Sequence, residues 1–209
     1  KEKYKFITAE RSFHGRTFAT VTATAQPKYH DGFLPMLPGF IYVPYNDIDA
    51  LHEAFTEEVA AVMIEPIQGE GGIHEATPEY MQTIRDLCDE YGAMMILDEV
   101  QTGLGRTGRW FGYQHYEVTP DIITMAKALG GGAAIGVMMA RPQIAASLVP
   151  GTHASTFGGN PLACAAGIAV IEAIEEGNLL DNAIKMGEYT RRKLDALKEK
   201  YPVIDHIRG

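Results

Sequence analysis

Two single charged residues, each placed directly after an apolar run, are the strongest candidates for chemistry in this sequence. Asp98 ends the run Met94–Leu97, where a carboxylate is costly unless it is paired, although it could equally cap a neighbouring loop. Lys127 lies between the run Ile122–Met125 and three glycines at 130–132, which let a ligand approach the backbone closely. We expect Lys127 to be buried rather than solvated, because burial lowers the pKa of a lysine and frees its amine for Schiff-base chemistry.

Three further segments combine glycine with polar side chains. Gln68–Gly72 is either a ligand-binding loop or a plain glycine-rich turn. Ser12–Thr17 places an aromatic residue and an arginine around a glycine. Ser155–Pro161 places two hydroxyl groups ahead of an expected helix start, which suits a phosphate because helix N-termini attract anions, and suits a plain helix cap equally well.

The segment Gly103–Gly108 matches the GxGxxG pattern of dinucleotide-binding folds, but its context does not fit. That fingerprint opens a helix and is followed by a ribose-binding acid about 20 residues later. Here the aromatic stretch Arg109–Tyr113 follows, with poor helix signals and without the Lys-Ser/Thr pair of a P-loop. The seven histidines show no HxxxH spacing and no cysteine partners. We therefore expect neither a nicotinamide site nor a metal site.

Alternating strand-like and helix-like segments must position these residues. Six apolar runs are expected as strands, and they are Tyr4–Thr8, Phe40–Val43, Val59–Ile64, Met94–Leu97, Ile122–Met125 and Ile135–Ala140. Their nearly continuous apolar character is typical of strands covered on both faces, so the pattern predicts an α/β fold with a mostly parallel sheet and flanking helices. The candidate segments follow these strands, and ligands bind at the carboxyl edge of such sheets.

The clearest predicted helix begins after Thr77 as its cap, has Pro78 in its first turn and stops at Gly92. A shorter helix is expected over 47–55, and longer ones over 161–176 and 179–200. The last of these carries mixed charge, so we expect an exposed helix that leads out of the domain.

Composition excludes several classes of protein. The formal net charge is 18 − 27 = −9, which argues against general nucleic-acid binding because that needs clustered Lys and Arg. No stretch reaches the ~20 apolar residues of a membrane helix, and no signal peptide is evident. Cys88 and Cys164 suggest no disulfide framework, so we expect a cytoplasmic protein. The ends lack an initiator Met and a polar tail, which suggests a piece of something longer.

Five segments, taken together and in this order, resemble the motif series of the class III aminotransferases, which use pyridoxal 5'-phosphate (PLP). They are Phe13–Thr17 (FHGRT), Ile64–Gly72 (IEPIQGEGG), Leu97–Gly103 (LDEVQTG), Lys127–Gly132 (KALGGG) and Ser155–Pro161 (STFGGNP). The resemblance covers essentially the whole chain, and the stretch His153–Ala166 is most similar to the acetylornithine branch. A minor departure is Ala134, where the family usually has proline.

The resemblance implies the large domain of a fold-type I PLP-dependent transferase, similar to aspartate aminotransferase. Residues 1–176 would form this PLP-binding domain, incomplete on its N-terminal side. Residues 177–209 would be a helix leading to a small C-terminal domain that is missing. The family's first phosphate loop would precede residue 1, and the arginine that binds α-carboxylates would follow residue 209.

The resemblance also implies roles for the candidate residues. Lys127 would carry the cofactor and then shuttle a proton. Asp98 would pair with the pyridinium nitrogen and keep it protonated, so that the ring can act as an electron sink. Gln101 would donate a hydrogen bond to the phenolic oxygen, while Val100 and Phe13 would sandwich the ring.

Further implied roles concern the phosphate and the substrate. Thr156, together with Ser155, would reach the phosphate bound by a neighbouring subunit, so the enzyme should be a homodimer. Arg16 would clamp a substrate carboxylate in a bidentate pair. Glu70 would act as a gate that neutralises a second arginine while the ω-amino donor is bound.

The activity implied is transfer of the ω-amino group of N-acetylornithine to 2-oxoglutarate, giving glutamate, as in arginine biosynthesis. Ornithine, succinylornithine and 4-aminobutyrate aminotransferases are alternatives, and so is an inactive core fragment that only folds or interacts. The expected partners are these small molecules and a second copy of the chain, with no nucleic acid and no membrane.

Overall fold

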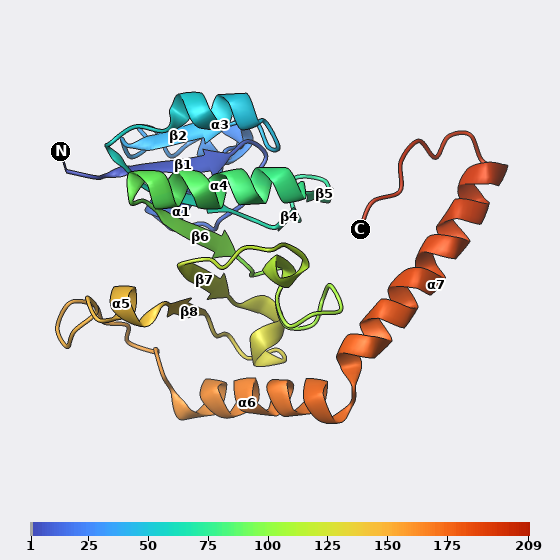
Figure 1. Ribbon diagram of the computed structural model, residues 1–209. Coiled ribbons are helices and arrows are strands. Elements are labelled where there is room, and N and C mark those ends of the chain that lie inside the picture. Colours follow the sequence, from blue (N-terminus) through green and yellow to red (C-terminus); the bar gives the residue numbers. More distant parts are fainter. Residues whose placement is uncertain (1) are drawn as a thin grey trace.

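A six-stranded sheet flanked by helices forms the body of the computed structural model, which describes residues 2–209 (Figure 1). Its strands are β1 (Lys5–Ala9), β2 (Phe40–Val43), β3 (Val59–Ile64), β6 (Met94–Asp98), β7 (Ile122–Met125) and β8 (Val137–Ala140). They lie in the order β2-β1-β3-β6-β7-β8. All neighbouring pairs are parallel except β7 and β8, which are antiparallel. The predicted mostly parallel α/β sheet is confirmed.

Helices and one small hairpin connect the strands. The α-helices are α1 (Phe18–Ala23), α2 (Pro27–His30), α3 (Ile48–Ala54), α4 (Pro78–Tyr91), α5 (Pro142–Ala145), α6 (Pro161–Glu176) and α7 (Leu179–Lys200). Two 3₁₀ helices are η1 (Gly112–His115) and η2 (Lys127–Gly130), and the hairpin consists of β4 (Ile67–Gln68) and β5 (His74–Glu75). The sequence did not predict α1, α2, α5 or the hairpin, because elements this short show too few turns for a periodic signal.

The helix α4 forms as its end signals predict. The Thr77 hydroxyl accepts a hydrogen bond from the backbone N–H of Tyr80 at 3.1 Å, and Gly92 ends the helix in the left-handed conformation at φ 60°. Tyr80, Met81 and Ile84 are fully buried and belong to the main core. Helix α4 packs on β3 and β6 with α3 beside it (Figure 1), and so covers one face of the sheet.

The order of the strands reverses direction near the middle of the sheet. From β1 the chain moves outward to β2, whereas from β3 it moves the opposite way to β6. The neighbouring strands β1 and β3 therefore form a topological switch point, and loops that leave such strands in opposite directions open a ligand site between them. The loops that follow β1 and β3 begin at residues 10 and 65.

A buried ion pair holds the opposite, amino edge of the sheet. Asp121 precedes β7 and accepts hydrogen bonds from the Arg85 guanidinium and the Met95 backbone N–H, both at 2.8 Å. The side chains of Arg85 and Asp121 are each 10% exposed. This pair ties α4 to the start of β6 and β7, and it lies far along the strands from the carboxyl edge.

Two expectations about exposure have different outcomes. The edge strand β8 is not covered on both faces by residues 2–209, because Met138 and Met139 are 49% and 42% exposed, so the prediction is wrong for this strand. Helix α7 has no buried residue among those described, which confirms an exposed helix, and the chain after it turns back to the hairpin, where Arg208 contacts His74 at 3.1 Å (Figure 1). That α7 leads out of the domain stays a prediction. In the described part of the chain, no helix is both long enough and apolar enough to cross a membrane.

Candidate active site

The predicted site residues lie on loops at the carboxyl edge of the sheet. Asp98 is the last residue of β6, and Lys127 is the second residue after β7. Because β6 and β7 are neighbouring parallel strands with Asp98 opposite Thr124, both residues leave the sheet on the same side. Phe13 follows β1, and Glu70 lies in the turn between β4 and β5.

The Asp98 carboxylate is held by three neighbours. Its Oδ2 lies 2.8 Å from His14 Nδ1, and its Oδ1 accepts from the Val100 backbone N–H at 3.1 Å and the Thr124 hydroxyl at 3.3 Å. A carboxylate only accepts hydrogen bonds, so we assign the proton of this contact to His14 Nδ1. The His14 side chain is 1% exposed. Asp98 is therefore paired with His14, as the free-energy cost of burying a carboxylate requires. Its bond to the Val100 N–H also caps the loop that follows β6.

His14 and Thr124 were missed as functional residues, although both lie beside predicted ones. His14 follows Phe13 directly, and Thr124 is a polar residue inside an otherwise apolar strand. Thr124 carried a signal, namely a hydrogen-bonding side chain where the strand pattern calls for an apolar one, whereas His14 was marked only by its place beside Phe13. Only the pairing of β6 with β7 and the fold of the 10–17 loop show that both reach Asp98.

Lys127 is exposed in this chain, so the expectation of a buried lysine is wrong for the residues described. It begins η2 with φ 44°, a left-handed conformation that is strained for a residue with a side chain. The glycines after it have no side chains to cover it, and Gly131 instead packs closely on Val170 of α6. Lys127 lines a pocket of about 510 Å³ together with Ser155.

The segment that contains Ser155 begins helix α6. Asn160 is the cap of α6, and its side-chain oxygen accepts from the Ala163 backbone N–H at 2.9 Å. Part of this segment is therefore a plain helix cap. Ser155 and Thr156 are exposed, and their phosphate-binding role stays a prediction.

Gln101 links two of the predicted segments. Its amide Nε2 donates to Glu70 Oε1 at 3.2 Å. A Cβ atom on Gly69 would overlap the Gln101 side-chain amide, so a larger residue at this position of the turn would displace that amide. The Gln68–Gly72 segment is thus a glycine-rich turn, and it also carries a side-chain contact to the predicted cofactor residue Gln101.

Arg16 and Phe13 lie next to each other in the loop after β1. The Arg16 guanidinium is 5.4 Å from the centre of the Phe13 ring and 4.4 Å from that of Tyr29. These cation–π contacts hold the arginine over aromatic faces while the side chain remains exposed. Its nitrogen atoms therefore remain available to a carboxylate.

The Gly103–Gly108 segment forms turns and opens no α-helix. Gly105 and Gly108 have φ 84° and 82°, and a side chain on them would collide with Leu180 and Ile184 of α7. Turn conformation and packing against α7 explain these glycines without any dinucleotide.

Two buried glutamates at this edge were not predicted. Glu65, just after β3, is 4% exposed, and burial raises its pKa to about 7. Glu99 is 1% exposed, and burial likewise raises its pKa. Glu99 accepts from the Thr102 hydroxyl and from the N–H groups of Gly112 and Tyr113 at 2.9 and 2.8 Å, so it shapes the loop after β6.

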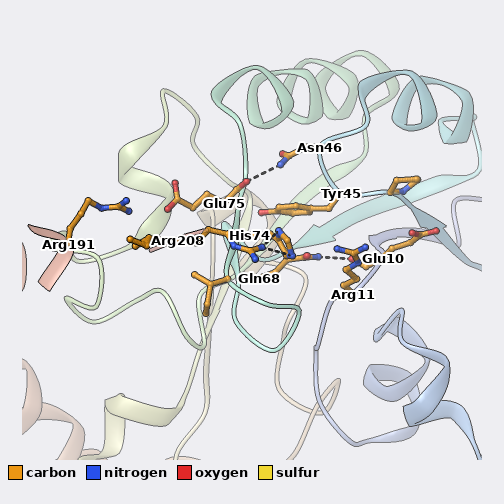
Figure 2. A pocket seen from close by; sticks show the side chains of 12 residues that line it. Glu10, Arg11, Tyr45, Asn46, Gln68, His74, Glu75, Arg191 and Arg208 are labelled. Carbon is orange, nitrogen blue, oxygen red and sulfur yellow. Dashed lines mark hydrogen bonds between the residues drawn. The ribbon is translucent and has the colours of Figure 1, made fainter. Parts of the chain in front are cut away.

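A second pocket, of about 550 Å³, lies beside the hairpin (Figure 2). Figure 2 shows Arg11, His74 and Arg208 pointing into it, and Gln68 Nε2 donates to the Glu10 carbonyl at 2.8 Å. None of the predicted site residues, all of which belong to the described part of the chain, lines this pocket.

The family model of the class III aminotransferases, described as "Aminotransferase class-III", matches residues 1–209. The chain belongs to the class III aminotransferases. It is 59% identical to the acetylornithine aminotransferase of Caldanaerobacter subterraneus over 208 residues, covering 100% of this chain and 53% of the relative. It is 54% identical to that of Methanocaldococcus jannaschii over 209 residues, covering 100% of this chain and 52% of the relative.

A solved structure of similar shape is the ornithine aminotransferase of Toxoplasma gondii, with a TM-score of 0.92 and 39% identity. The match covers 99% of this chain and 50% of the solved chain. This class III aminotransferase chain thus spans about half the length of the relatives it matches. The resemblance found in its motifs, and the implied fold, are confirmed.

PLP is the cofactor of class III aminotransferases, and the residues present fit it. A pyridinium nitrogen needs an acceptor of fixed orientation, and Asp98 has three neighbours that hold it. The carbonyl of PLP needs a primary amine that it can reach, and Lys127 presents one in a pocket that Ser155 shares.

Proposed function

We propose that the full-length protein that carries this chain is a PLP-dependent aminotransferase, which moves the ω-amino group of N-acetylornithine to 2-oxoglutarate. The observation that carries the proposal is the Asp98 carboxylate, held by His14 and Thr124 at the end of β6, with Lys127 on the loop after the neighbouring strand. The high identity to two acetylornithine aminotransferases supports this choice of donor.

When bound, PLP supplies an electron sink that stabilises negative charge on the substrate carbon. Lys127 would hold the cofactor through its amine, and that amine, when free, would move a proton at the substrate carbon. Asp98 holds the proton on the ring nitrogen, and His14 fixes the orientation of that carboxylate. Phe13 and Val100 bind the two faces of the ring.

The remaining roles serve the phenolic oxygen, the phosphate and the substrate. Gln101 donates to the phenolic oxygen of the cofactor. Its side chain also bonds Glu70, and so links the cofactor residue Gln101 to the proposed substrate gate. Glu70 gates the exchange between the ω-amino donor and the 2-oxo acid, while Arg16 binds a substrate carboxylate. Ser155 and Thr156 bind the phosphate across a homodimer.

The test is the visible absorption of the protein after addition of PLP, with a Lys127→Ala variant beside it. We expect the band of the lysine-bound cofactor in the parent and its loss in Lys127→Ala. A Lys185→Ala variant, which changes an exposed lysine on α7, is the control and should keep the band. A band that survives in Lys127→Ala would contradict the assignment of the cofactor lysine.

A panel of amino donors separates the related activities. We expect N-acetylornithine to be used with a higher kcat/KM than ornithine, N-succinylornithine or 4-aminobutyrate. A wide preference for unacylated ornithine would replace the proposed donor. The 209-residue chain alone would be an inactive core fragment if it stays monomeric and colourless with PLP while the full-length protein takes up the cofactor.

We also propose the division into a large domain over residues 1–176 and a helical connection over 177–209 to a further domain. The exposure of α7 supports it. The cytoplasmic location expected from the sequence stays a prediction.

A further inference from the structure

The Glu65 carboxylate joins two loops that are far apart in the sequence. Its Oε2 accepts from the backbone N–H of Phe13 at 3.1 Å, and its Oε1 accepts from that of Gly69 at 3.3 Å. Phe13 belongs to the loop after β1, whereas Gly69 belongs to the turn after β3. Because β1 and β3 form the topological switch point, one carboxylate spans the crevice between their loops.

The backbone on which Glu65 sits is also fixed. The Tyr45 hydroxyl donates to the carbonyl oxygens of Glu65 and Pro66 at 2.8 and 3.1 Å. Glu65 is 4% exposed, so its carboxylate has little freedom to leave its two partners for water. A fixed residue with two acceptor oxygens therefore sets the separation of Phe13 and Gly69.

Each of the two loops carries a residue of the proposed site. Phe13 is the residue proposed to cover one face of the cofactor ring. Gly69 precedes Glu70, the proposed gate, and packs on Gln101, which bonds Glu70 at 3.2 Å. The ring-stacking residue and the gate are thus held to the same carboxylate.

Burial of this charge is unfavourable for the fold itself. The pKa of Glu65 is raised to about 7, chiefly by burial and also by the nearby Asp98 charge, even though His14 and the two N–H bonds lower it. A glutamine at position 65 would occupy the same space without a charge. It would offer only one acceptor oxygen, so the reason for a carboxylate here is the pair of backbone N–H groups of Phe13 and Gly69 that it bonds.

We propose that Glu65 is a positioning residue of the transamination site, which holds the ring-stacking loop of Phe13 and the gate loop of Glu70 in register through its two oxygens. The inference rests on the proposed function, because it needs PLP on the face that Phe13 covers. Glu65 touches neither cofactor nor substrate, and it acts through the backbone of the two loops.

A Glu65→Gln variant separates this role from simple packing. The glutamine side chain keeps one acceptor oxygen for one of the two backbone N–H groups. Its NH₂ group, a donor, faces the other backbone N–H, so either Phe13 or Gly69 loses its hydrogen-bond acceptor. We expect the Kd for PLP to rise by about tenfold or more, since an unsatisfied donor of this kind has that effect on an equilibrium. We also expect the KM for 2-oxoglutarate to rise more than that for the donor, because Glu70 gates the two substrates differently.

The control variant is Asp121→Asn. It also neutralises a buried carboxylate that accepts a backbone N–H, but at the opposite edge of the sheet. In the full-length protein, Asp121→Asn should match the parent in the Kd for PLP, titrated into the apoprotein, and in the ratio of the two KM values at saturating PLP. The visible circular dichroism of the bound cofactor, which reports the ring's seating, should change only in Glu65→Gln.

The outcomes are distinguishable. If the parent takes up PLP but Glu65→Gln has the parent's Kd for PLP and the parent's ratio of KM values, the role of Glu65 is overturned. The proposed function then still stands. A parent that takes up no PLP overturns the proposed function and, with it, this role. Equal effects in Glu65→Gln and Asp121→Asn would mean general destabilisation and also overturn the role.

Hydrogen exchange on the unmodified holoenzyme tests the same contact without any variant. The amide protons of Phe13 and Gly69 both lie in loops, yet both should be protected to a similar degree. Exchange of either amide at the rate of an open loop would refute the shared carboxylate.

Discussion

Replacement of Glu65 by glutamine should make the fold less sensitive to rising pH, even though it weakens the site. The ordinary pKa of this carboxyl is 4.5, and burial raises it to about 7 in the folded protein. Because the folded pKa is the higher one, the folded state binds the proton more tightly than the unfolded state. The stability that Glu65 contributes is therefore complete below pH 4.5 and is lost as the pH rises through about 7.

The size of the effect follows from the two pKa values. A change from 4.5 to about 7 corresponds to about 3 kcal/mol in total. Between about pH 5.5 and about pH 8.5 the protonation equilibria yield a loss of about 2 kcal/mol for the parent. Glutamine resembles the protonated glutamate and does not titrate, so the variant should lack this loss.

The assay is urea unfolding of the full-length apoprotein at both pH values, parent beside variant. The quantity of interest is the difference between the two proteins in the free energy of unfolding, and how it changes with pH. Other groups titrate in both proteins and cancel, except those that face Glu65, namely His14, Asp98 and the Tyr45 hydroxyl. A parent that is stabilised relative to Glu65→Gln as the pH rises would refute the reasoning, because Glu65 would then be a favourable buried charge.

Two further substitutions test other parts of the structure. Gly69→Ala should displace the Gln101 amide and raise the Kd for PLP severalfold while leaving the urea midpoint nearly unchanged, because the overlap is with the end of a flexible side chain. The control Gly187→Ala, in the interior of α7 where a Cβ meets nothing within 4 Å, should leave the Kd for PLP unchanged and raise the urea midpoint slightly through helix propensity. A PLP affinity equal to the parent's in Gly69→Ala would contradict the contact. Asp121→Asn should lower the free energy of unfolding by roughly 3 kcal/mol, since it leaves the 10% exposed Arg85 guanidinium without its buried partner. A loss well below about 1 kcal/mol in urea unfolding would show that the pair contributes little.

Much of the fold could be predicted because its signals are local. The strands β2, β3 and β7 and the helices α6 and α7 have the predicted bounds, and α4 begins and ends where Thr77 and Gly92 indicate. Apolar runs, caps and stops are properties of neighbouring residues, so they can be read along the chain. The start of β8 was placed two residues early, at Ile135 rather than Val137, because an apolar run does not show where pairing begins.

The site was predictable only in part, because its polar contacts join residues distant in sequence. The ordered motifs gave Lys127, Asp98 and Gln101, which lie at the end of a strand or within three residues after one. The partners of Asp98 come from 84 and 26 residues away, His14 and Thr124, and no local pattern pairs them.

By itself, the sequence determined the α/β sheet, the family and the positions of the residues proposed for cofactor chemistry, since each depends on residue types in a fixed local order. The tertiary structure alone decided that Lys127 lies exposed, that the Gly103–Gly108 glycines serve packing on α7, and that Glu65 joins two loops. These depend on burial and on which strands become neighbours, quantities that arise only when distant segments pack together.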